Sequence, residues 1–111
     1  MSQTVPQPFA GLDLLSSAVV LLDERLTICH INAAAENLFQ ISSKVFAGCR
    51  LDSVADCPAE LLAAFDSALR HGWAYTGQTV DLRIAGGELL KVNCTVNPAD
   101  TPEARLVVEL W

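Results

Sequence analysis

Apolar residues in the first third of the chain follow helix and strand spacing in turn. They recur at helical spacing over residues 9–17, which predicts a short N-terminal helix. Residues 18–22 form an unbroken apolar run of strand length that is rich in β-branched side chains, and residues 26–31 continue as a second strand. Only the polar residues 23–25 separate the two segments. We therefore expect an antiparallel hairpin, because so short a connection cannot join parallel strands.

Helical segments are predicted after this hairpin. Asn32 is a suitable N-cap, since its side chain can accept hydrogen bonds from the free amides of a first turn, and residues 33–39 carry an apolar face behind it. The serine pair 42–43 offers a second cap, for a short turn that Gly48 can end in the left-handed region. Residues 51–57 follow no period, so we expect them to be irregular.

The clearest helical pattern covers residues 58–71. Pro58 suits the first helical position, where its missing N–H is not needed. Gly72 suits the position just beyond the end, where a left-handed backbone is common. An apolar stripe on this helix would face the core, and it consists of Leu61, Leu62, Phe65, Ala68 and Leu69.

The pattern changes to strict alternation in the last third of the chain. Alternating apolar and polar residues predict strands over residues 79–84, 90–97 and 104–110. The glycine pair 86–87 provides a hairpin turn between the first two. In the last strand, Ala104, Leu106, Val108 and Leu110 would share one face.

This order of elements predicts an α+β fold. Strands with one apolar face need a cover, and the helices between residues 32 and 71 are the material available for it. We expect a five-stranded antiparallel sheet covered on one face by short helices, with an N-terminal helix. Residues 1–8 would be an extended or disordered lead-in, and residues 9–111 would form one domain.

Composition narrows the classes of partner. The 111 residues include 13 acidic and 7 basic side chains, for a formal charge of −6, and the basic ones are scattered. A nucleic-acid surface is therefore disfavoured. The longest apolar run is far shorter than the roughly 20 residues that a membrane-spanning helix needs. We expect a cytoplasmic domain that contacts neither nucleic acid nor membrane.

Several residues could carry chemistry but lack the companions that chemistry requires. Asp23 and Glu24 follow an apolar run, as the acidic pair of a phospho-acceptor receiver domain does, but a receiver needs a parallel sheet. We interpret the two acids as a hairpin turn. His30 and His71 have no recognisable orienting partner or companion ligands.

Acidic residues and cysteines of the middle segment give no catalytic pattern either. Asp52 and Asp56 flank the irregular segment and are interpreted as solvated acids. The four cysteines, at positions 29, 49, 57 and 94, show no metal-binding spacing and would be unpaired thiols in a reducing compartment. No catalytic constellation emerges, so we expect the chain not to be an enzyme.

One stretch of sequence resembles a known family. The stretch is Leu21-Leu22-Asp23-x-x-Leu26-x-Ile28-x-x-Ile31-Asn32-x-Ala34-Ala35-Glu36-x-Leu38-Phe39. It resembles the start of a PAS domain, in which a hairpin leads into a helix that opens with Asn, small residues and an acid. The resemblance extends over residues 9–111. It is most like the N-terminal sensor domain of NtrB-type nitrogen-regulation histidine kinases.

The resemblance implies a function in signalling. It implies a non-catalytic sensor, signal-relay and dimerisation domain of a two-component sensor kinase. Its partners would be a second copy, the rest of the parent kinase, and a nitrogen-signal regulatory protein. The chain contains neither a phospho-acceptor box nor a glycine-rich nucleotide site, so the parent's catalytic parts are absent from it. The alternative is a small-ligand-binding PAS sensor attached to a transcription factor or a cyclic-dinucleotide enzyme.

Family members that hold flavin or haem allow a comparison. In the flavin-adduct motif the cysteine lies three residues after a glycine, whereas Cys49 directly follows Gly48. Haem-binding members use a histidine on the long helix, but His71 stands at its end. We therefore expect no cofactor. A small-ligand pocket between helix and sheet is the remaining candidate site, unless the same residues simply fill the core; its lining would be Phe65, Leu69, Leu82, Val92 and Cys94.

We predict that the chain dimerises through its N-terminal helix. Candidate contacts are Phe9, Leu12, Leu14 and Leu15, which give this short segment apolar residues on two sides. One side can pack on the chain's own sheet and the other on a partner related by a two-fold axis. Sedimentation of the intact chain should show a concentration-dependent dimer, and deletion of residues 1–16 should abolish it. Equal dimerisation of the truncated chain would place the interface elsewhere.

Overall fold

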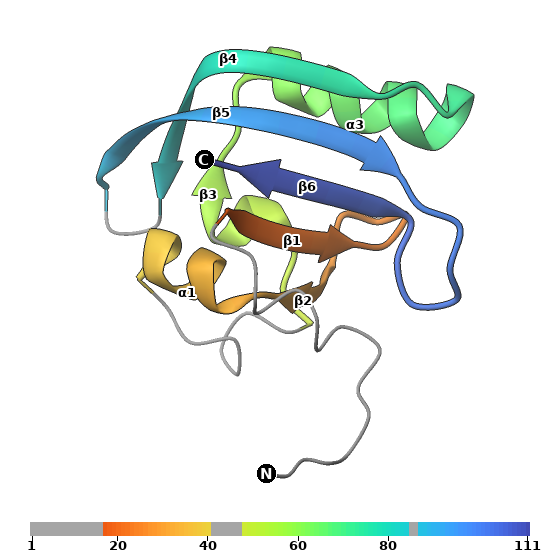
Figure 1. Ribbon diagram of the computed structural model, residues 1–111, viewed down its shortest axis with the longest axis horizontal. Coiled ribbons are helices and arrows are strands. Elements are labelled where there is room, and N and C mark those ends of the chain that lie inside the picture. Colours follow the sequence, from red (N-terminus) through yellow and green to blue (C-terminus); the bar gives the residue numbers. More distant parts are fainter. Residues whose placement is uncertain (1–16, 41–47, 85–86) are drawn as a thin grey trace, which may run out of the picture.

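The computed structural model describes residues 17–40, 48–84 and 87–111. Six antiparallel strands in these ranges form one curled sheet in the order β2-β1-β6-β5-β4-β3 (Figure 1). The strands are β1 (Ala18–Leu22), β2 (Ile28–Ile31), β3 (Ala55–Asp56), β4 (Tyr75–Ile84), β5 (Leu89–Pro98) and β6 (Leu106–Leu110). The helices are α1 (Ala33–Phe39), the 3-10 helix η2 (Leu51–Ser53) and α3 (Ala59–His71).

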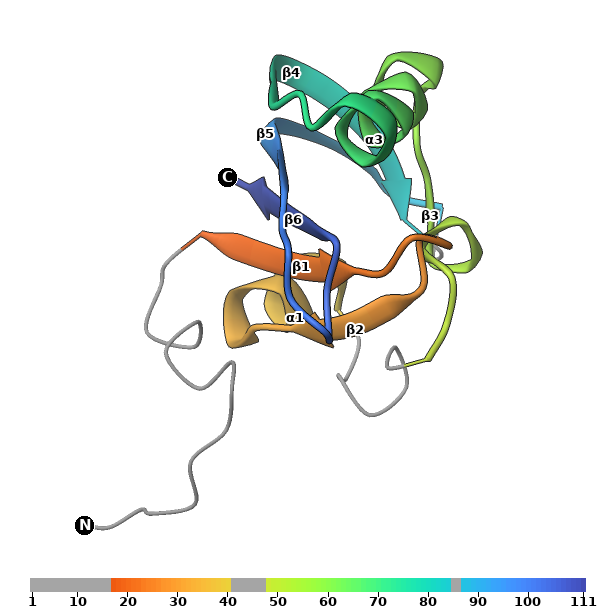
Figure 2. The ribbon, with the colours of Figure 1, turned by 90° about the vertical axis from the view of Figure 1, so that its right-hand side faces the viewer.

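Pairing between β1 and β6 joins the two halves of the chain. The ladder runs from Ala18 opposite Leu110 to Leu22 opposite Leu106. The N-terminal hairpin is thereby built into the sheet formed by the last three strands. Helix α3 packs against β4 and β5, and α1 packs against β1 (Figure 2). The α+β class and the helix-covered antiparallel sheet are thus confirmed.

The main core lies between the helices and the sheet. Helix α3 contributes the buried side chains Leu61, Ala64, Phe65 and Ala68, of which Phe65 is 1% exposed. The prediction that Leu62 belongs to this stripe is wrong, because its side chain is 46% exposed. At about 100° per residue, Leu62 lies about 160° around the helix from Ala64, and so it falls outside the arc of α3 that faces the sheet. The prediction that Pro58 is the first helical residue is off by one position, because α3 begins at Ala59 and Pro58 is its N-cap.

A second, smaller cluster lies on the opposite face of the sheet. It consists of Val19, Leu21 and Ala104, with Cys29 and Val107 packed against them. The alternation predicted that Ala104 shares a face with Leu106. This prediction is wrong, because the two side chains belong to different clusters. The strand β6 begins only at Leu106, and Ala104 belongs to the loop before it. There its amide donates to the Oγ1 of Thr101 (2.9 Å).

The strand that the sequence did not predict is β3. Its two residues, Ala55 and Asp56, pair with Ile84 and Arg83 at the end of β4. They lie in the segment that was expected to be irregular, after the single turn η2. A two-residue strand leaves no periodic signal, so the prediction of five strands was one short.

The predicted strand over residues 79–84 is the second half of a longer one. The β4–β5 register shifts between Gly77 and Val80, and Thr79 in this bulge has a φ of 54°. The side chain of Asn93 on β5 accepts a hydrogen bond from the Thr79 amide (3.1 Å) and holds the bulge. The bulge interrupts the alternation, so the pattern revealed only the part beyond it.

The predicted N-cap at Asn32 is confirmed. Its Oδ1 accepts from the amide of Ala35 in α1 (2.9 Å) and also from the amide of Val19 in β1 (2.9 Å). Its Nδ2 donates to the carbonyl of Ser17 (2.9 Å). Asn32 is fully buried, so one side chain connects β1, the end of β2 and α1. The predicted N-terminal helix and the cap at residues 42–43 lie outside the described residues.

No helix within the described ranges is long and apolar enough to cross a membrane.

Replacing Asn32 with alanine should destabilise the domain by about 3 kcal/mol, because a cap is lost and buried partners on β1 are left unsatisfied. Urea denaturation of Asn32→Ala should therefore show a lower midpoint with an unchanged slope. Asn97→Ala is the matched control, since Asn97 is exposed on β5 and should change stability by less than about 0.5 kcal/mol. Equal effects of the two substitutions would contradict the role of Asn32.

Candidate functional site

The predicted pocket residues mostly lie in the core. Phe65 projects from the middle of α3 toward the sheet, where Leu82, Val92 and Cys94 are also buried, while Leu69 is half-buried at the edge. A cavity beside Phe65 and Leu82 has a volume of only about 10 Å³. This is about the space that one water molecule requires, so the core as described has no room for a larger ligand.

A much larger groove lies at the surface next to this part of the core. Its volume is about 480 Å³, which falls within the usual range for small-molecule sites. It brings the β1–β2 turn against a later, continuous part of the chain that comprises η2, β3 and the first two turns of α3. Its lining residues are Leu26, Arg50, Leu51, Asp52, Ala55, Asp56, Cys57, Leu62 and Phe65. We call it the α3 groove.

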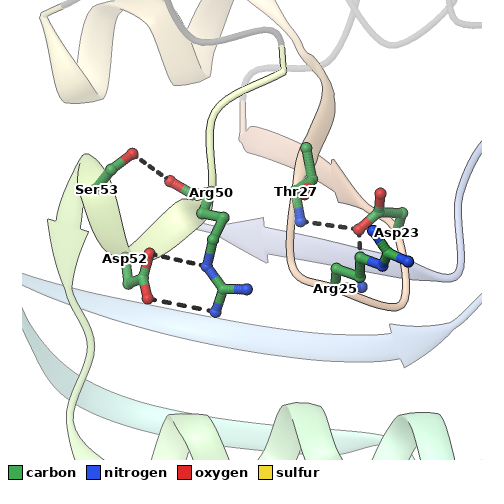
Figure 3. A network of polar contacts seen from close by, with 6 residues as sticks. All are labelled: Asp23, Arg25, Thr27, Arg50, Asp52 and Ser53. Atoms are coloured by element: carbon green, nitrogen blue, oxygen red, sulfur yellow. Dashed lines mark hydrogen bonds and ion pairs between the residues drawn. The ribbon is translucent and has the colours of Figure 1, made fainter.

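The β1–β2 turn forms one wall of the α3 groove. Oδ1 of Asp23 accepts hydrogen bonds from the amides of Arg25 (2.8 Å) and Thr27 (2.9 Å), as Figure 3 shows. The Asp23 carbonyl accepts from the amide of Leu26 (3.0 Å), which has a φ of 63°. The interpretation of Asp23 as a turn residue is confirmed, and the turn places Leu26 at the groove.

The segment before β3 forms the second wall. Thr27 and Arg50 form an antiparallel bridge, and the amide of Leu51 donates to the carbonyl of Leu26 (2.9 Å). The hydroxyl of Ser53 donates to the Arg50 carbonyl (2.6 Å) and closes the turn of η2. The Arg50 guanidinium lies along the carboxylate of Asp52, with Nε–Oδ1 and Nη2–Oδ2 distances of 3.3 Å each (Figure 3).

The third wall is the chain entering α3. Asp56 is exposed at its rim, and Cys57 is half-buried beneath it. Burial raises the pKa of the Cys57 thiol to about 11, with smaller contributions from the carboxylates of Asp52 and Asp56. The thiol of Cys57 is therefore protonated at neutral pH. Burial also raises the pKa of Cys94, to about 12.

A contact beside the groove ties α3 to the sheet. Oη of Tyr75 on β4 donates to Oε2 of Glu60 in the first turn of α3 (2.7 Å). This hydrogen bond is the main reason why the pKa of Tyr75 is raised to about 12. The tyrosine folds back over Gly77, where any Cβ would collide with its Oη. Glycine at position 77 is thus needed for α3 to be held in place by this bond.

Both histidines lie away from the groove lining. His30 is half-buried on β2, and His71 ends α3 with its ring 4.7 Å from that of Trp73. Within the described ranges, no three His, Cys, Asp or Glu side chains are grouped as metal ligands would be. The candidate dimer contacts Phe9, Leu12, Leu14 and Leu15 lie outside those ranges.

Residues 50–57 carry a sequence signal for the groove. Charged and apolar side chains are mixed there without a regular period, with Arg50, Asp52 and Asp56 between Leu51, Ala55 and Cys57. Asp52 and Asp56 are solvated, as interpreted, but they also form the rim of a hollow. Only the folding of α3 and of the β1–β2 turn against this segment creates that hollow.

Comparison with known proteins defines the class. No protein-family model matches the chain, and no curated protein matches it. Solved structures do: the PAS domain of a two-component sensor histidine kinase has a TM-score of 0.69 at 13% identity, covering 90% of this chain and 87% of that one. A PAS domain of a LuxR-family transcriptional regulator from Burkholderia thailandensis, in complex with ethanol, has a TM-score of 0.69 at 18% identity, covering 96% of each chain.

The chain therefore has the PAS fold. More particularly, it is similar to the PAS domain of nitrogen regulation protein NR(II) from Vibrio parahaemolyticus, with 29% identity and a TM-score of 0.81. That match covers 96% of this chain and 98% of the other. PAS domains are sensor domains, and the fold itself carries no catalytic centre.

The raised pKa of Cys57 predicts slow alkylation. Because only the thiolate reacts, the rate at Cys57 should keep increasing up to about pH 11 in the folded chain, whereas a free cysteine levels off above about pH 8.5. The folded chain holds the Cys57 proton more tightly than the unfolded chain does. The contribution of this proton to the free energy of unfolding is therefore complete below the pKa of Cys57 in the unfolded chain. It is lost as the pH rises through the pKa of about 11 in the folded chain. Mass spectrometry of iodoacetamide adducts would measure the rate; the unfolded chain is the control. A plateau near pH 8.5 in the folded chain would contradict this prediction.

Proposed function

We propose that the chain is the sensor and signal-relay domain of a two-component histidine kinase of the NtrB type, acting in nitrogen regulation. The observation that carries the proposal is the similarity to the NR(II) PAS domain at 29% identity, which extends over nearly the full length of both domains. The two other PAS domains described above share the fold at only 18% and 13% identity. The fold supports a sensor, and the higher identity supports this particular output.

The domain would act by relaying a change rather than by catalysing one. In this proposal it is cytoplasmic and forms a homodimer that positions the kinase core of its parent protein. A nitrogen-signal regulatory protein would act on the same kinase. The connection of β1 with β6 supports such a relay, because a change at the N-terminal hairpin reaches the strand next to the C-terminus through one ladder.

A second candidate function is a small-ligand sensor attached to another output. The specific observation in its favour is the α3 groove of about 480 Å³. A PAS domain of similar fold from a transcriptional regulator was solved in complex with ethanol. The two functions are compatible at the level of this domain and differ in what the domain controls.

A domain exchange would test the nitrogen-kinase proposal. Replacing the PAS domain of Vibrio parahaemolyticus NR(II) with residues 1–111 should give a kinase that still labels itself with ATP and still responds to nitrogen supply. Exchange with the Burkholderia thailandensis PAS domain is the matched control, since it shares the fold at 18% identity. An active chimera that no longer responds to nitrogen would refute the proposed role. Labelling of isolated residues 1–111 would refute the non-catalytic assignment.

A further inference from the structure

We propose that the α3 groove binds a small organic cation, a primary ammonium group carrying a short aliphatic body. The inference rests on the proposed sensor function and names the class of ligand that this domain would sense. Two properties of the groove carry it: an apolar floor and a rim with excess negative charge.

The floor of the groove suits an aliphatic body. Phe65, Leu51 and Ala55 line it and are buried, none of them more than 6% exposed. Leu62 stands at its side with 46% of its surface exposed. An aliphatic body of four carbons in the groove would cover part of Leu62 and gain the free energy of burying apolar surface.

The rim of the groove suits a positive charge. Arg50 is its one cation among the described lining residues, and its guanidinium is already matched by the carboxylate of Asp52. Asp56 forms no ion pair within the described part of the chain. Arg83, which lies opposite Asp56 in the β3–β4 register, donates to the carbonyl of Gly87 (3.0 Å), and together with Asp52 and Asp56 it lines an adjoining hollow. The described lining of the α3 groove itself therefore has one carboxylate more than it has cations.

The thiol of Cys57 lies in the field of the same two carboxylates. Burial is the main cause of its raised pKa, and the carboxylates of Asp52 and Asp56 raise the pKa further. An anionic ligand would meet the same field and would have to displace Asp52 from Arg50. An ammonium group has no such competitor at Asp56.

The position of the groove would make occupancy detectable by the rest of the domain. A ligand there would contact the β1–β2 turn through Leu26, η2 through Leu51, and α3 through Leu62. The first two are already joined by the hydrogen bond from the Leu51 amide to the Leu26 carbonyl, so a ligand that also contacts Leu62 would connect both of them to α3.

Three probes with the same aliphatic body separate charge from apolar binding: n-butylammonium, butyrate and 1-butanol. Each would be titrated into the uniformly ¹⁵N-labelled chain at neutral pH and low salt, with amide chemical shifts as the readout. Butylammonium should shift the amides of Leu26, Asp56 and Leu62 with a dissociation constant of about 1–10 mM, as expected for so small a ligand. Butyrate and butanol should bind several-fold more weakly.

Two substitutions test the charges directly. Asp56→Asn keeps the shape of the side chain and should weaken butylammonium binding about two- to five-fold, the effect of one exposed ionic contact. Asp52→Asn should release Arg50 and move the preference toward butyrate. Asp100→Asn is the control, because it makes the same change of charge at an exposed position outside the groove. It should leave binding unchanged.

Every other outcome overturns the inference. Equal binding of butanol would mean that only the apolar floor matters, and preferential binding of butyrate to the unmodified chain would reverse the sign of the site. Shifts outside the groove, or equal loss in Asp56→Asn and Asp100→Asn, would also refute it. Such a result would leave the proposed kinase role intact, since the domain exchange tests that role without any ligand.

Discussion

The side chain of Asn32 is the constraint on which the N-terminal half of the fold depends. The chain leaves the sheet immediately after Ile31, so the ladder between β1 and β2 ends there while β1 continues to Ala18. The side-chain carboxamide of Asn32 is the hydrogen-bond partner of the Val19 amide and of the Ser17 carbonyl, which have no partner on β2. The same carboxamide caps α1. A buried carboxamide that satisfies three backbone groups fixes their relative positions, because leaving any of them unpaired would cost about 1–3 kcal/mol.

A second polar side chain does for the groove what Asn32 does for the core. The carboxylate of Asp23 accepts hydrogen bonds from two amides of its own turn. In this turn Leu26 has a positive φ. The Leu26 carbonyl then accepts a hydrogen bond from the amide of Leu51. The amide of Ile28 donates to the carbonyl of Cys49 (2.7 Å). The irregular segment is thus held along the edge at β2 by backbone hydrogen bonds, and its side chains are free to form the groove. Local turn chemistry and the candidate site are therefore parts of one structure.

The sequence predicted those features that have a local cause. The Asn32 cap, the Asp23 turn and the alternation of Val80, Leu82 and Ile84 each follow from neighbouring residues and were confirmed. Features that depend on distant pairing were missed: β3 exists only because Ile84 lies opposite Ala55, and the bulge at Thr79 needs Asn93. The groove was missed for the same reason. Its walls come from the β1–β2 turn and from residues 50–65, and no local pattern reveals that these two parts of the chain meet.

The opposing demands of core and surface explain why the groove lies outside the core. Leu61 and Phe65 lie on the face of α3 that packs on the sheet. They fill the space between helix and sheet so closely that a cavity of only about 10 Å³ remains. A ligand inside would have to separate α3 from β4 against the Tyr75–Glu60 hydrogen bond and the burial of both side chains. At the surface, the same helix presents Leu62 beside an unmatched carboxylate at no cost to the core. A PAS domain with a filled interior can therefore still offer a ligand site, and in this chain the first turn of α3 belongs to both.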